Sequence, residues 1–272
     1  MTRAMTETDK TFAGSIPALY DRHLGPMIFE PYALDIAERV ARLAPKRILE
    51  IAAGTGIVTR ALARTLPAVP IVATDLNQPM LDHASAHTSA GAITWRQADG
   101  QALPFADGSF DVVVCQFGVM FFPDKAAAFG EARRVLAPGG RFLFSVWDHI
   151  EENEATDLVS RAVASLFPKD PPGFLARTPH GYHDLATIGD ALKHSGFSAV
   201  KGETVPKRGR ASSARDPAIG FCQGSPLRNE IEARDKSRLD EATDIAAEAV
   251  AKRFGRGPID GKIQAHVIVA AR

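Results

Sequence analysis

Short apolar runs alternate with segments of helical periodicity from Lys46 onward. The runs are rich in β-branched residues, and the periodic segments repeat their apolar positions every three or four residues. This alternation predicts a parallel sheet covered by helices on both faces. The unbroken apolar run at 112–114 favours a central strand that is buried on both faces. In chain order, the expected strands are Ile48–Ile51, Ile71–Asp75, Ile93–Ala98, Phe110–Phe117, Arg141–Trp147, Phe197–Val205 and Lys262–Ala271.

Two long stretches depart from this alternation. Residues 148–184 are polar and rich in proline, with a helical pattern near Ala155–Phe167. Residues 206–261 separate the last two expected strands and carry helical patterns at Pro226–Ala233 and Leu239–Phe254. Because a hairpin between neighbouring strands needs only a few residues, the second stretch predicts a lid or a substrate wall.

Composition and charge exclude several classes of protein. With 272 residues and 45% hydrophobic content, the chain can bury a full core. Lys and Arg total 32, as do Asp and Glu, and no basic block is interleaved with aromatic residues, so we expect no nucleic-acid partner. The most apolar stretch, Phe110–Phe122, contains polar residues and is shorter than the ~20 residues that span a bilayer, so no membrane span is expected.

Cysteine usage and the first residues bear on the location of the protein. Cys115 and Cys222 are too few for a disulfide framework, and Met1–Lys10 is polar where a secretory signal needs an apolar centre. We therefore expect a cytoplasmic protein. The apolar surroundings of Cys115 in the sequence favour an inert core residue over a nucleophile.

The residues with the most specific chemical meaning follow the first expected strand. The segment Glu50-Ile51-Ala52-Ala53-Gly54-Thr55-Gly56 passes from strand to helix through a loop with few side chains. Glycine lets a ligand approach the backbone, and the first amide groups of a helix are available as hydrogen-bond donors. The dinucleotide pattern G-x-G-x-x-G is not met, because its third glycine position holds Thr59. Asp75 ends the second strand, where a carboxylate either accepts both hydroxyls of a ribose or caps the next helix.

Four stretches occur in the order and spacing of one enzyme family, and together they are more specific than any single motif. They are Glu50–Gly56, Thr74–Leu76 with Met80–Leu81, Ala98–Phe105 with Phe110–Val113, and Arg134–Gly140. With them the chain resembles the class I S-adenosylmethionine-dependent methyltransferases, in the broad bacterial group that includes ubiquinone and menaquinone biosynthesis methyltransferases. The resemblance weakens after Trp147. It departs from the family at Ala52, which replaces the usual first glycine with the smallest alternative.

The resemblance implies both a fold and a cofactor. The implied fold is α/β, a Rossmann-like doubly wound sheet of seven strands, mostly parallel with an antiparallel last strand and helices on both faces. The implied domain is single, over 1–272, with an N-terminal helical cap at 1–44, a cofactor-binding half at 45–147 and substrate-side inserts at 148–184 and 206–261. The cofactor is S-adenosyl-L-methionine, whose sulfonium methyl is already activated, so transfer needs mainly a positioned acceptor and no metal.

The resemblance also assigns roles to individual residues. Asp75 would hold the ribose hydroxyls, and Glu50 would support the loop from beneath. Tyr20, from the N-terminal segment, would lie near the carboxylate of the cofactor. The methionine part would be contacted by Ala52, Gly54 and Gly56, and the adenine would be lined by Leu76 and Met80. The adenine amino group would be contacted by Asp99 and Gly100, and the sulfonium by Gln116 and Phe117.

Each assignment has a purely structural alternative. By spacing alone, Leu76 and Met80 equally fit the core face of a helix, and Asp99 fits a turn ahead of glycine. Tyr20 equally fits packing against the body of the fold.

One histidine is a candidate general base. His149 follows the expected fifth strand, and ligands of open α/β sheets bind outside the carboxyl ends of the strands. The alternative, an exposed loop histidine, is favoured for a lone His. The eight histidines lack the spacing of a ligand cluster, so no metal site is expected.

The acceptor is less well defined than the cofactor. Phe117, Met120, Phe122 and Trp147 fit either an apolar or aromatic acceptor or ordinary core packing. The segment Cys115–Gly118 lacks the Asp/Asn-Pro-Pro-aromatic motif of methyltransferases that act on nucleic-acid bases, which favours a small molecule. Three hypotheses follow: a small-molecule methyltransferase, an NAD(P)-dependent oxidoreductase, and a non-catalytic module that binds S-adenosylmethionine.

Overall fold

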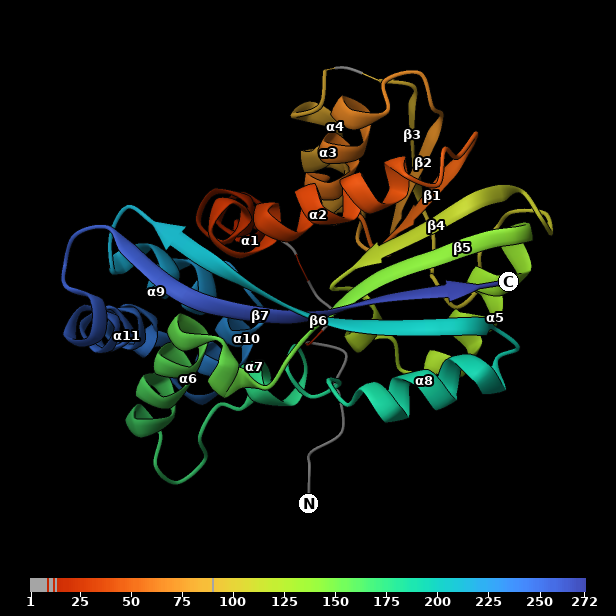
Figure 1. Ribbon diagram of the computed structural model, residues 1–272. Coiled ribbons are helices and arrows are strands. Elements are labelled where there is room, and N and C mark those ends of the chain that lie inside the picture. Colours follow the sequence, from red (N-terminus) through yellow and green to blue (C-terminus); the bar gives the residue numbers. More distant parts are fainter. Residues whose placement is uncertain (1–8, 10–11, 13, 90) are drawn as a thin grey trace. The chain divides into compact units, whose positions relative to one another are not determined.

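The computed structural model describes residues 9, 12, 14–89 and 91–272, and within them seven strands form one sheet (Figure 1). The strand order is β3-β2-β1-β4-β5-β7-β6. The pairs β3-β2, β2-β1, β1-β4 and β4-β5 are parallel, whereas β7 runs antiparallel to both β5 and β6. The predicted α/β fold with a mostly parallel sheet is therefore confirmed. The strands are β1 (Ile48–Ile51), β2 (Ile71–Asp75), β3 (Ile93–Gln97), β4 (Phe110–Gln116), β5 (Leu136–Trp147), β6 (Ser198–Ala211) and β7 (Ile259–Ala271).

Helices connect most of these strands, and a π-helix, Tyr20–Phe29, joins the first two helices. Among the described residues, no helix has both the length and the apolar character needed to cross a membrane. The α-helices are α1 (Ile16–Leu19), α2 (Glu30–Ala41), α3 (Ile57–Thr65), α4 (Gln78–Ala86), α5 (Lys125–Val135), α6 (Glu154–Leu166), α7 (Phe174–Arg177), α8 (Leu185–His194), α9 (Arg215–Cys222), α10 (Leu227–Asp235) and α11 (Leu239–Phe254).

The main differences from the predicted helix and strand bounds occur at glycine and proline residues. Helix α5 ends at Val135, and β5 begins at once with Leu136, although Pro138-Gly139-Gly140 predicted a turn there. Helices α7 and α9 were not predicted. The first has four residues, too few to show a period, and the second contains Pro217 and Gly220, which disfavour a helix by propensity.

The chain divides into two compact units, each built from three segments. Unit 1 comprises Met1–Pro31, Trp147–Gly181 and Pro206–Gln264, and unit 2 comprises Tyr32–Val146, Tyr182–Val205 and Ala265–Arg272.

Unit 2 contains the parallel part of the sheet. The valines at 112–114 are at most 2% exposed, which confirms that β4 is buried on both faces. Phe129 of α5 packs on Phe144 of β5, with ring centroids 5.7 Å apart. Burying a side chain of this size contributes about 1.5–3 kcal/mol, so the core holds the ends of β1, β2 and β4 at fixed positions.

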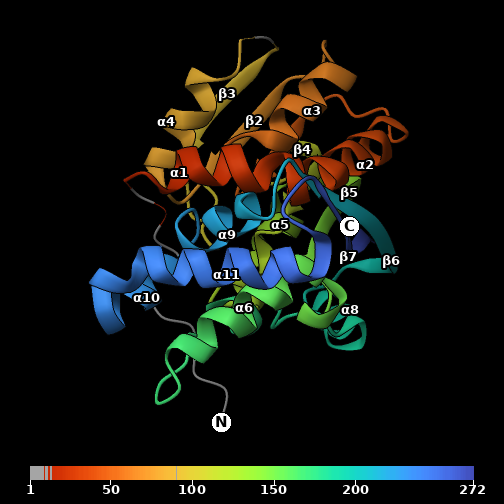
Figure 2. The same cartoon turned by 90° about the vertical axis from the view of Figure 1, so that its left-hand side faces the viewer.

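Unit 1 is mainly helical, and α11 lies along α6 and α9 (Figure 2). The face of α11 that is buried carries Ala242, Ala246 and Val250, each at 0% exposure. These small side chains fall four residues apart, so they form one stripe along the helix and allow close packing.

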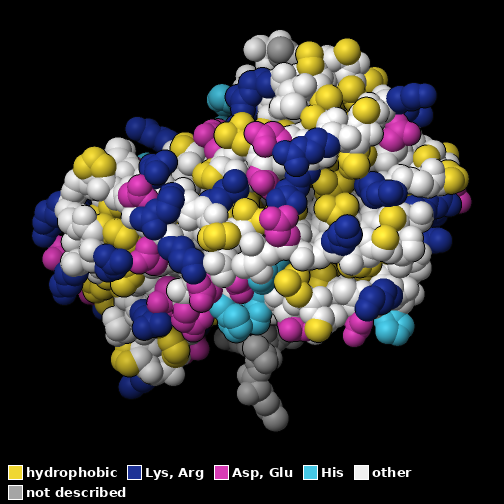
Figure 3. Space-filling view, in the orientation of Figure 1, with side chains coloured by type: hydrophobic (Ala, Val, Ile, Leu, Met, Phe, Trp, Pro, Cys, Tyr) yellow, Lys and Arg dark blue, Asp and Glu magenta, His cyan; other side chains and the backbone are white. Residues whose placement is uncertain are grey.

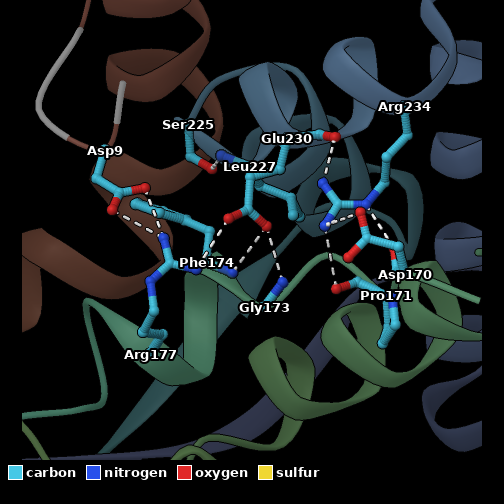
Figure 4. Close-up of polar contacts among 10 residues, drawn as sticks. All are labelled: Asp9, Asp170, Pro171, Gly173, Phe174, Arg177, Ser225, Leu227, Glu230 and Arg234. Carbon is cyan, nitrogen blue, oxygen red and sulfur yellow. Dashed lines mark hydrogen bonds and ion pairs between the residues drawn. The ribbon is translucent and has the colours of Figure 1, made fainter. Parts of the chain in front are cut away.

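A buried group of charges ties three segments of unit 1 together (Figure 4). One Nη of Arg177 donates to both carboxylate oxygens of Asp9, at 2.7 and 2.8 Å, and the other donates to Glu230 at 2.9 Å. The second oxygen of Glu230 accepts the backbone N–H groups of Gly173 and Phe174. We name Asp9, Arg177 and Glu230 the arginine cluster.

Candidate cofactor site

The loop between β1 and α3 holds three residues in the left-handed region. Ala52, Gly54 and Gly56 have φ values of 55°, 55° and 80°. Only glycine adopts this region freely, and another residue costs about 1–2 kcal/mol. The sequence pattern therefore matches a backbone requirement at two of the three positions, and Ala52 occupies the third under strain.

The two glycines of this loop serve different purposes. A Cβ placed on Gly54 would have one described neighbour within 4 Å, the Met80 Cε at 3.9 Å, so the space above Gly54 is open. A Cβ on Gly56 would lie 2.8 Å from the ring of Trp95 and 3.1 Å from the Cβ of Ala84. Gly54 thus permits a ligand to approach, whereas Gly56 permits close packing against β3 and α4.

The structure shows how Ala52 is accommodated. A Cβ on Gly118, just after β4, would lie 2.5 Å from the Ala52 Cβ and 2.7 Å from the Cys115 Sγ. The alanine at position 52 therefore depends on a glycine at position 118.

Asp75 fixes the loop to the end of β2. Its Oδ2 accepts the Gly54 N–H at 2.8 Å, and its Oδ1 accepts the Asn77 N–H at 2.8 Å. Oδ1 also accepts the side-chain amide of Asn77 at 3.4 Å. A carboxylate offers about four lone-pair positions, so Oδ2 retains capacity for a further donor such as a ribose hydroxyl. Asp75 is 7% exposed, and burial raises its pKa. It is not the cap of α4, because Asn77 occupies the N-cap position.

Glu50 lies in β1 beneath the loop and is 2% exposed. Its Oε2 accepts the hydroxyl of Thr59, in the first turns of α3, at 2.6 Å. Burial raises the pKa of Glu50 to about 8, with the negative charge of Asp75 a smaller contribution. Through the bond to Thr59, Glu50 joins β1 to α3.

The residues expected around adenine differ in exposure. Leu76 is 45% exposed, which makes it one of the few exposed large apolar side chains, whereas Met80 is 3% exposed. Asp99 accepts the backbone N–H of Gln101 at 2.8 Å, the geometry of a turn. A Cβ on Gly100 would lie 2.9 Å from Ile51 Cγ2, so this glycine is needed for packing. Leu76 alone in this group presents an apolar surface that remains to be covered.

The end of β4 contains a strained residue that the sequence did not reveal. Phe117 has a φ of 54°, is 6% exposed, and donates its N–H to the carbonyl of Ser145 at 3.0 Å. The ring of Tyr32 meets that of Phe117 edge-on at 5.4 Å. Non-glycine residues in the left-handed region are costly and cluster at functional sites. Gln116, the residue before, is partly buried.

Two predicted site residues, Tyr20 and His149, belong to unit 1. The Tyr20 ring is stacked on Phe29 at 4.7 Å and meets Phe12 edge-on at 5.9 Å. The His149 side chain is 61% exposed, and its Nδ1 lies 4.0 Å from a carboxylate oxygen of Glu151.

Sequence reasoning missed a second histidine near the end of β5. His180 is 5% exposed, and its Nδ1 lies 2.7 Å from the carbonyl oxygen of Asp148. Because a carbonyl only accepts, Nδ1 carries the proton and Nε2 is the basic nitrogen of the neutral ring. The ring also lies 5.9 Å from that of Trp147, the last residue of β5. No pattern in the sequence indicated His180, because its contact with Asp148 joins residues that are 32 positions apart.

Three features of unit 2 suit a nucleoside ligand. Asp75 can accept hydroxyl groups, Gly54 leaves room for a close approach, and Leu76 offers an apolar surface for a flat ring. All three lie at the carboxyl ends of β1 and β2, where ligands of open α/β sheets bind.

Comparisons of sequence identify the family of the chain. The sequence model of the methyltransferase domain family matches residues 49–144. The ubiquinone/menaquinone biosynthesis C-methyltransferase UbiE of Dinoroseobacter shibae is 31% identical over 175 residues, which cover 60% of this chain and 70% of that protein. The demethylmenaquinone methyltransferase of Thermus thermophilus is 45% identical over 102 residues, which cover 37% of this chain and 46% of that protein. The chain thus spans about half the length of several curated relatives that it matches.

Comparison of structures supports the same fold. The solved YcgJ protein of Bacillus subtilis superposes with a TM-score of 0.57 and 20% identity, covering 89% of this chain and 98% of that one. At this identity the likeness shows the fold alone. With the domain match and the UbiE relative, it follows that the chain belongs to the class I S-adenosylmethionine-dependent methyltransferases.

Proposed function

We propose that this protein transfers the methyl group of S-adenosylmethionine to a small-molecule acceptor with an apolar or aromatic body. The observation that carries the proposal is the bond between Asp75 and the Gly54 N–H, beside the open space above Gly54. A buried carboxylate that is already held by two backbone donors needs no rearrangement to receive a ribose. Preorganisation of this kind reduces the free-energy cost of binding.

The proposed contacts follow the chemistry of each side chain. Asp75 would accept the ribose hydroxyls, and Leu76 would cover the adenine, which would also explain its exposure. The backbone at Ala52 and Gly54 would pass beneath the methionine part. When bound, S-adenosylmethionine supplies an activated methyl group. The chain positions the acceptor and excludes water, and for an acidic acceptor it also removes a proton. The roles of Tyr20, Asp99, Gly100, Gln116 and Phe117 remain predictions in the same scheme.

An aromatic acceptor is suggested by a row of rings in unit 1. Tyr20 stacks on Phe29, and Phe29 lies 6.0 Å from Trp147, the last residue of β5. Flat apolar surfaces favour flat apolar ligands. The printed names of two relatives, a C-methyltransferase of ubiquinone and menaquinone biosynthesis and a demethylmenaquinone methyltransferase, describe quinone chemistry and agree with this choice.

If the acceptor needs a base, two histidines compete for the role. His149 was predicted from the end of the fifth strand, but its side chain is 61% exposed, which leaves its orientation weakly fixed. The Nδ1 bond of His180 to the Asp148 carbonyl fixes the tautomer and favours His180. A matched pair of variants, His149→Ala and His180→Ala, decides between them through the pH profile of kcat/KM. Only loss of the true base removes the acidic limb of that profile.

We further propose that the whole chain acts as one methyltransferase domain. In this proposal, residues 45–147 bind the cofactor, residues 1–44 form a helical cap, and residues 148–184 and 206–261 serve the acceptor. A cytoplasmic location is supported by Cys115 and Cys222, which are both buried and unbridged.

The decisive experiment is a binding measurement followed by a turnover assay. Isothermal titration of the purified chain with S-adenosylhomocysteine should give a saturable heat, and titration with NAD+ or NADP+ should give none. Binding of a nicotinamide cofactor alone would refute the proposal in favour of an oxidoreductase. Transfer of labelled methyl to one of a panel of phenols and hydroquinones distinguishes an enzyme from a module that only binds the cofactor.

A further inference from the structure

Unit 1 contains a groove of about 550 Å³ whose lining includes none of the residues named above for the cofactor or for a base. All of its lining residues fall within two segments of unit 1, Met1–Pro31 and Pro206–Gln264. Its walls come from four elements: the π-helix, the end of β6, the first turn of α9, and the start of β7 with the residue before it. A groove of this size lies within the range of small-molecule sites, about 300–1,000 Å³.

The base of the groove is apolar. Met27 of the π-helix and Ile259 of β7 are 2% and 3% exposed, and Pro26 and Pro258 extend this surface outward. Among these four residues, only backbone atoms can donate or accept a hydrogen bond. A ligand in the groove would therefore place an apolar body on them.

The rim of the groove is rich in guanidinium groups. Arg22 is exposed and makes no hydrogen bond or ion pair with any residue that the structure describes. Arg210 donates to Asp260 at 2.9 Å, and Asp260 also accepts from Arg208, so one carboxylate is shared between two cations. Figure 3 shows dark blue and magenta side chains side by side in its left-hand part, where these ends of β6 and β7 lie in Figure 1.

The second carboxylate of the groove is already satisfied. Asp216 accepts from the hydroxyl groups of Ser212 and Ser213, at 2.9 and 3.0 Å, and lies 3.1 Å from Nδ1 of His23. These contacts lower the pKa of Asp216 against the effect of its burial, so it stays ionised. Two arginines and two aspartates therefore line the groove, with Arg208 beside it. Arg210 is bonded to Asp260, so Arg22 is the guanidinium of the lining that has no carboxylate partner among the described residues.

The wall that carries Arg22 has an uncommon backbone. Residues 20–29 form a π-helix of 10 residues with Pro26 inside it, and π-helical turns are rare and concentrate at functional sites. Packing imposes this shape, because a Cβ on Gly220 of α9 would lie 2.5 Å from Leu24 of the π-helix. Unit 1 thus holds Arg22 and Met27 on one rigid wall of the groove.

We propose that this groove binds a small organic carboxylate, with its charged end at Arg22 and Arg210 and its apolar body on Pro26 and Pro258, which continue the apolar base formed by Met27 and Ile259. One arginine without a carboxylate partner among the described residues, Arg22, matches a monoanion. A phosphate dianion fits less well, since Asp216 and Asp260 would repel the second charge. A guanidinium presents paired N–H donors with the geometry of a carboxylate, which adds direction to the attraction.

The test uses 1-naphthoate as the probe, titrated into the full chain without cofactor and followed by isothermal calorimetry. Saturable binding is expected, about tenfold weaker for the neutral 1-naphthamide and about tenfold weaker for Arg22→Ala, because a hydrogen bond to a charged group is lost. Inorganic phosphate, which carries charge without an apolar body, should bind at least tenfold more weakly than the naphthoate.

Arg161→Ala is the matched control, because Arg161 is another exposed arginine of unit 1, bonded to Asp157 and outside the groove. It should bind naphthoate like the parent protein. Arg22→Ala should keep the parent melting temperature, since Arg22 has no described bond to lose. The proposal is overturned if naphthoate does not bind at millimolar concentration, if naphthamide binds equally well, or if Arg22→Ala and Arg161→Ala have the same effect. None of these outcomes bears on cofactor binding, so the proposed methyl transfer is tested separately.

Discussion

The cofactor site of unit 2 and the arginine cluster of unit 1 hold buried carboxylates in opposite ways. In unit 2, Asp75 is held by two backbone N–H groups, from Gly54 and Asn77. In unit 1, Asp9 is held by the guanidinium of Arg177, which also bonds to Glu230. Backbone donors leave the carboxylate its charge for a ligand, whereas an arginine neutralises it. Burial of an acidic group therefore fits the proposed ribose contact in unit 2 and a structural tie in unit 1.

The largest effect is expected from Arg177→Ala. Removing the shared cation takes away the ion pairs that Arg177 makes with Asp9 and with Glu230, which should lower the free energy of unfolding by about 3–5 kcal/mol. Urea denaturation measures this change. The control Arg161→Ala, which removes an exposed pair with Asp157, should cost less than about 1 kcal/mol. Equal losses in the two variants would show that the arginine cluster is no structural tie.

Glu50, in unit 2, should make the free energy of unfolding depend on pH. The folded protein holds the Glu50 proton up to about pH 8, whereas the unfolded chain releases it near 4.5. Between these values the folded state binds more protons, so the free energy of unfolding should fall as pH rises, by up to about 1.4 kcal/mol per pH unit. Urea denaturation at pH 5, 6, 7 and 8 measures the slope. Glu50→Gln should flatten it, and an unchanged slope in this variant would assign the effect to another group.

Asp75→Ala tests the unit 2 side of the comparison. It should weaken S-adenosylhomocysteine binding by about 1.5–3 kcal/mol, because charge-assisted hydrogen bonds to the ribose are lost. Asp111→Ala is a matched control, since Asp111 also accepts two backbone N–H groups, those of Lys46 and Arg47, but near the amino end of β4. Titration calorimetry on both variants separates the effect of losing ligand contacts from the effect of losing hydrogen bonds to the backbone. Unchanged affinity in Asp75→Ala would remove the ribose assignment.

The smallest effect concerns the strained alanine of the loop. Ala52→Gly should stabilise the protein slightly, by less than about 1 kcal/mol, because relief of the left-handed φ is partly offset by the greater freedom of glycine when unfolded. Gly118→Ala should destabilise the parent by about 1–3 kcal/mol through the 2.5 Å contact with the Ala52 Cβ. In the double variant with Ala52→Gly, the destabilisation caused by Gly118→Ala should be smaller, because the Ala52 Cβ is absent. Additive melting-temperature shifts would show that the two positions are not coupled.

Sequence patterns were most informative where structure depends on neighbours along the chain. The valine run of β4 and the helical period of α11 each follow from local spacing, and both elements occur where the sequence predicted them. Helix α9 was missed because tertiary packing overrides the propensities of Pro217 and Gly220. The role of Gly118 was also invisible, since it depends on Ala52, which is 66 positions away in the sequence yet in contact through the ends of two adjacent strands.

The sequence by itself determined the α/β fold, the methyltransferase family and the residues at the carboxyl ends of β1 and β2. These properties follow from periodicity, loop composition and motif order, all of which are written along the chain. Only the tertiary structure decided that Gly54 leaves open space while Gly56 is a packing residue, that Phe117 is strained, and that His180 bonds through Nδ1 to the Asp148 carbonyl. It also brought Arg22 beside Arg210 in one groove. Each of these facts depends on atoms that are distant in sequence, because conformation and contact are set by the packed core and not by local pattern.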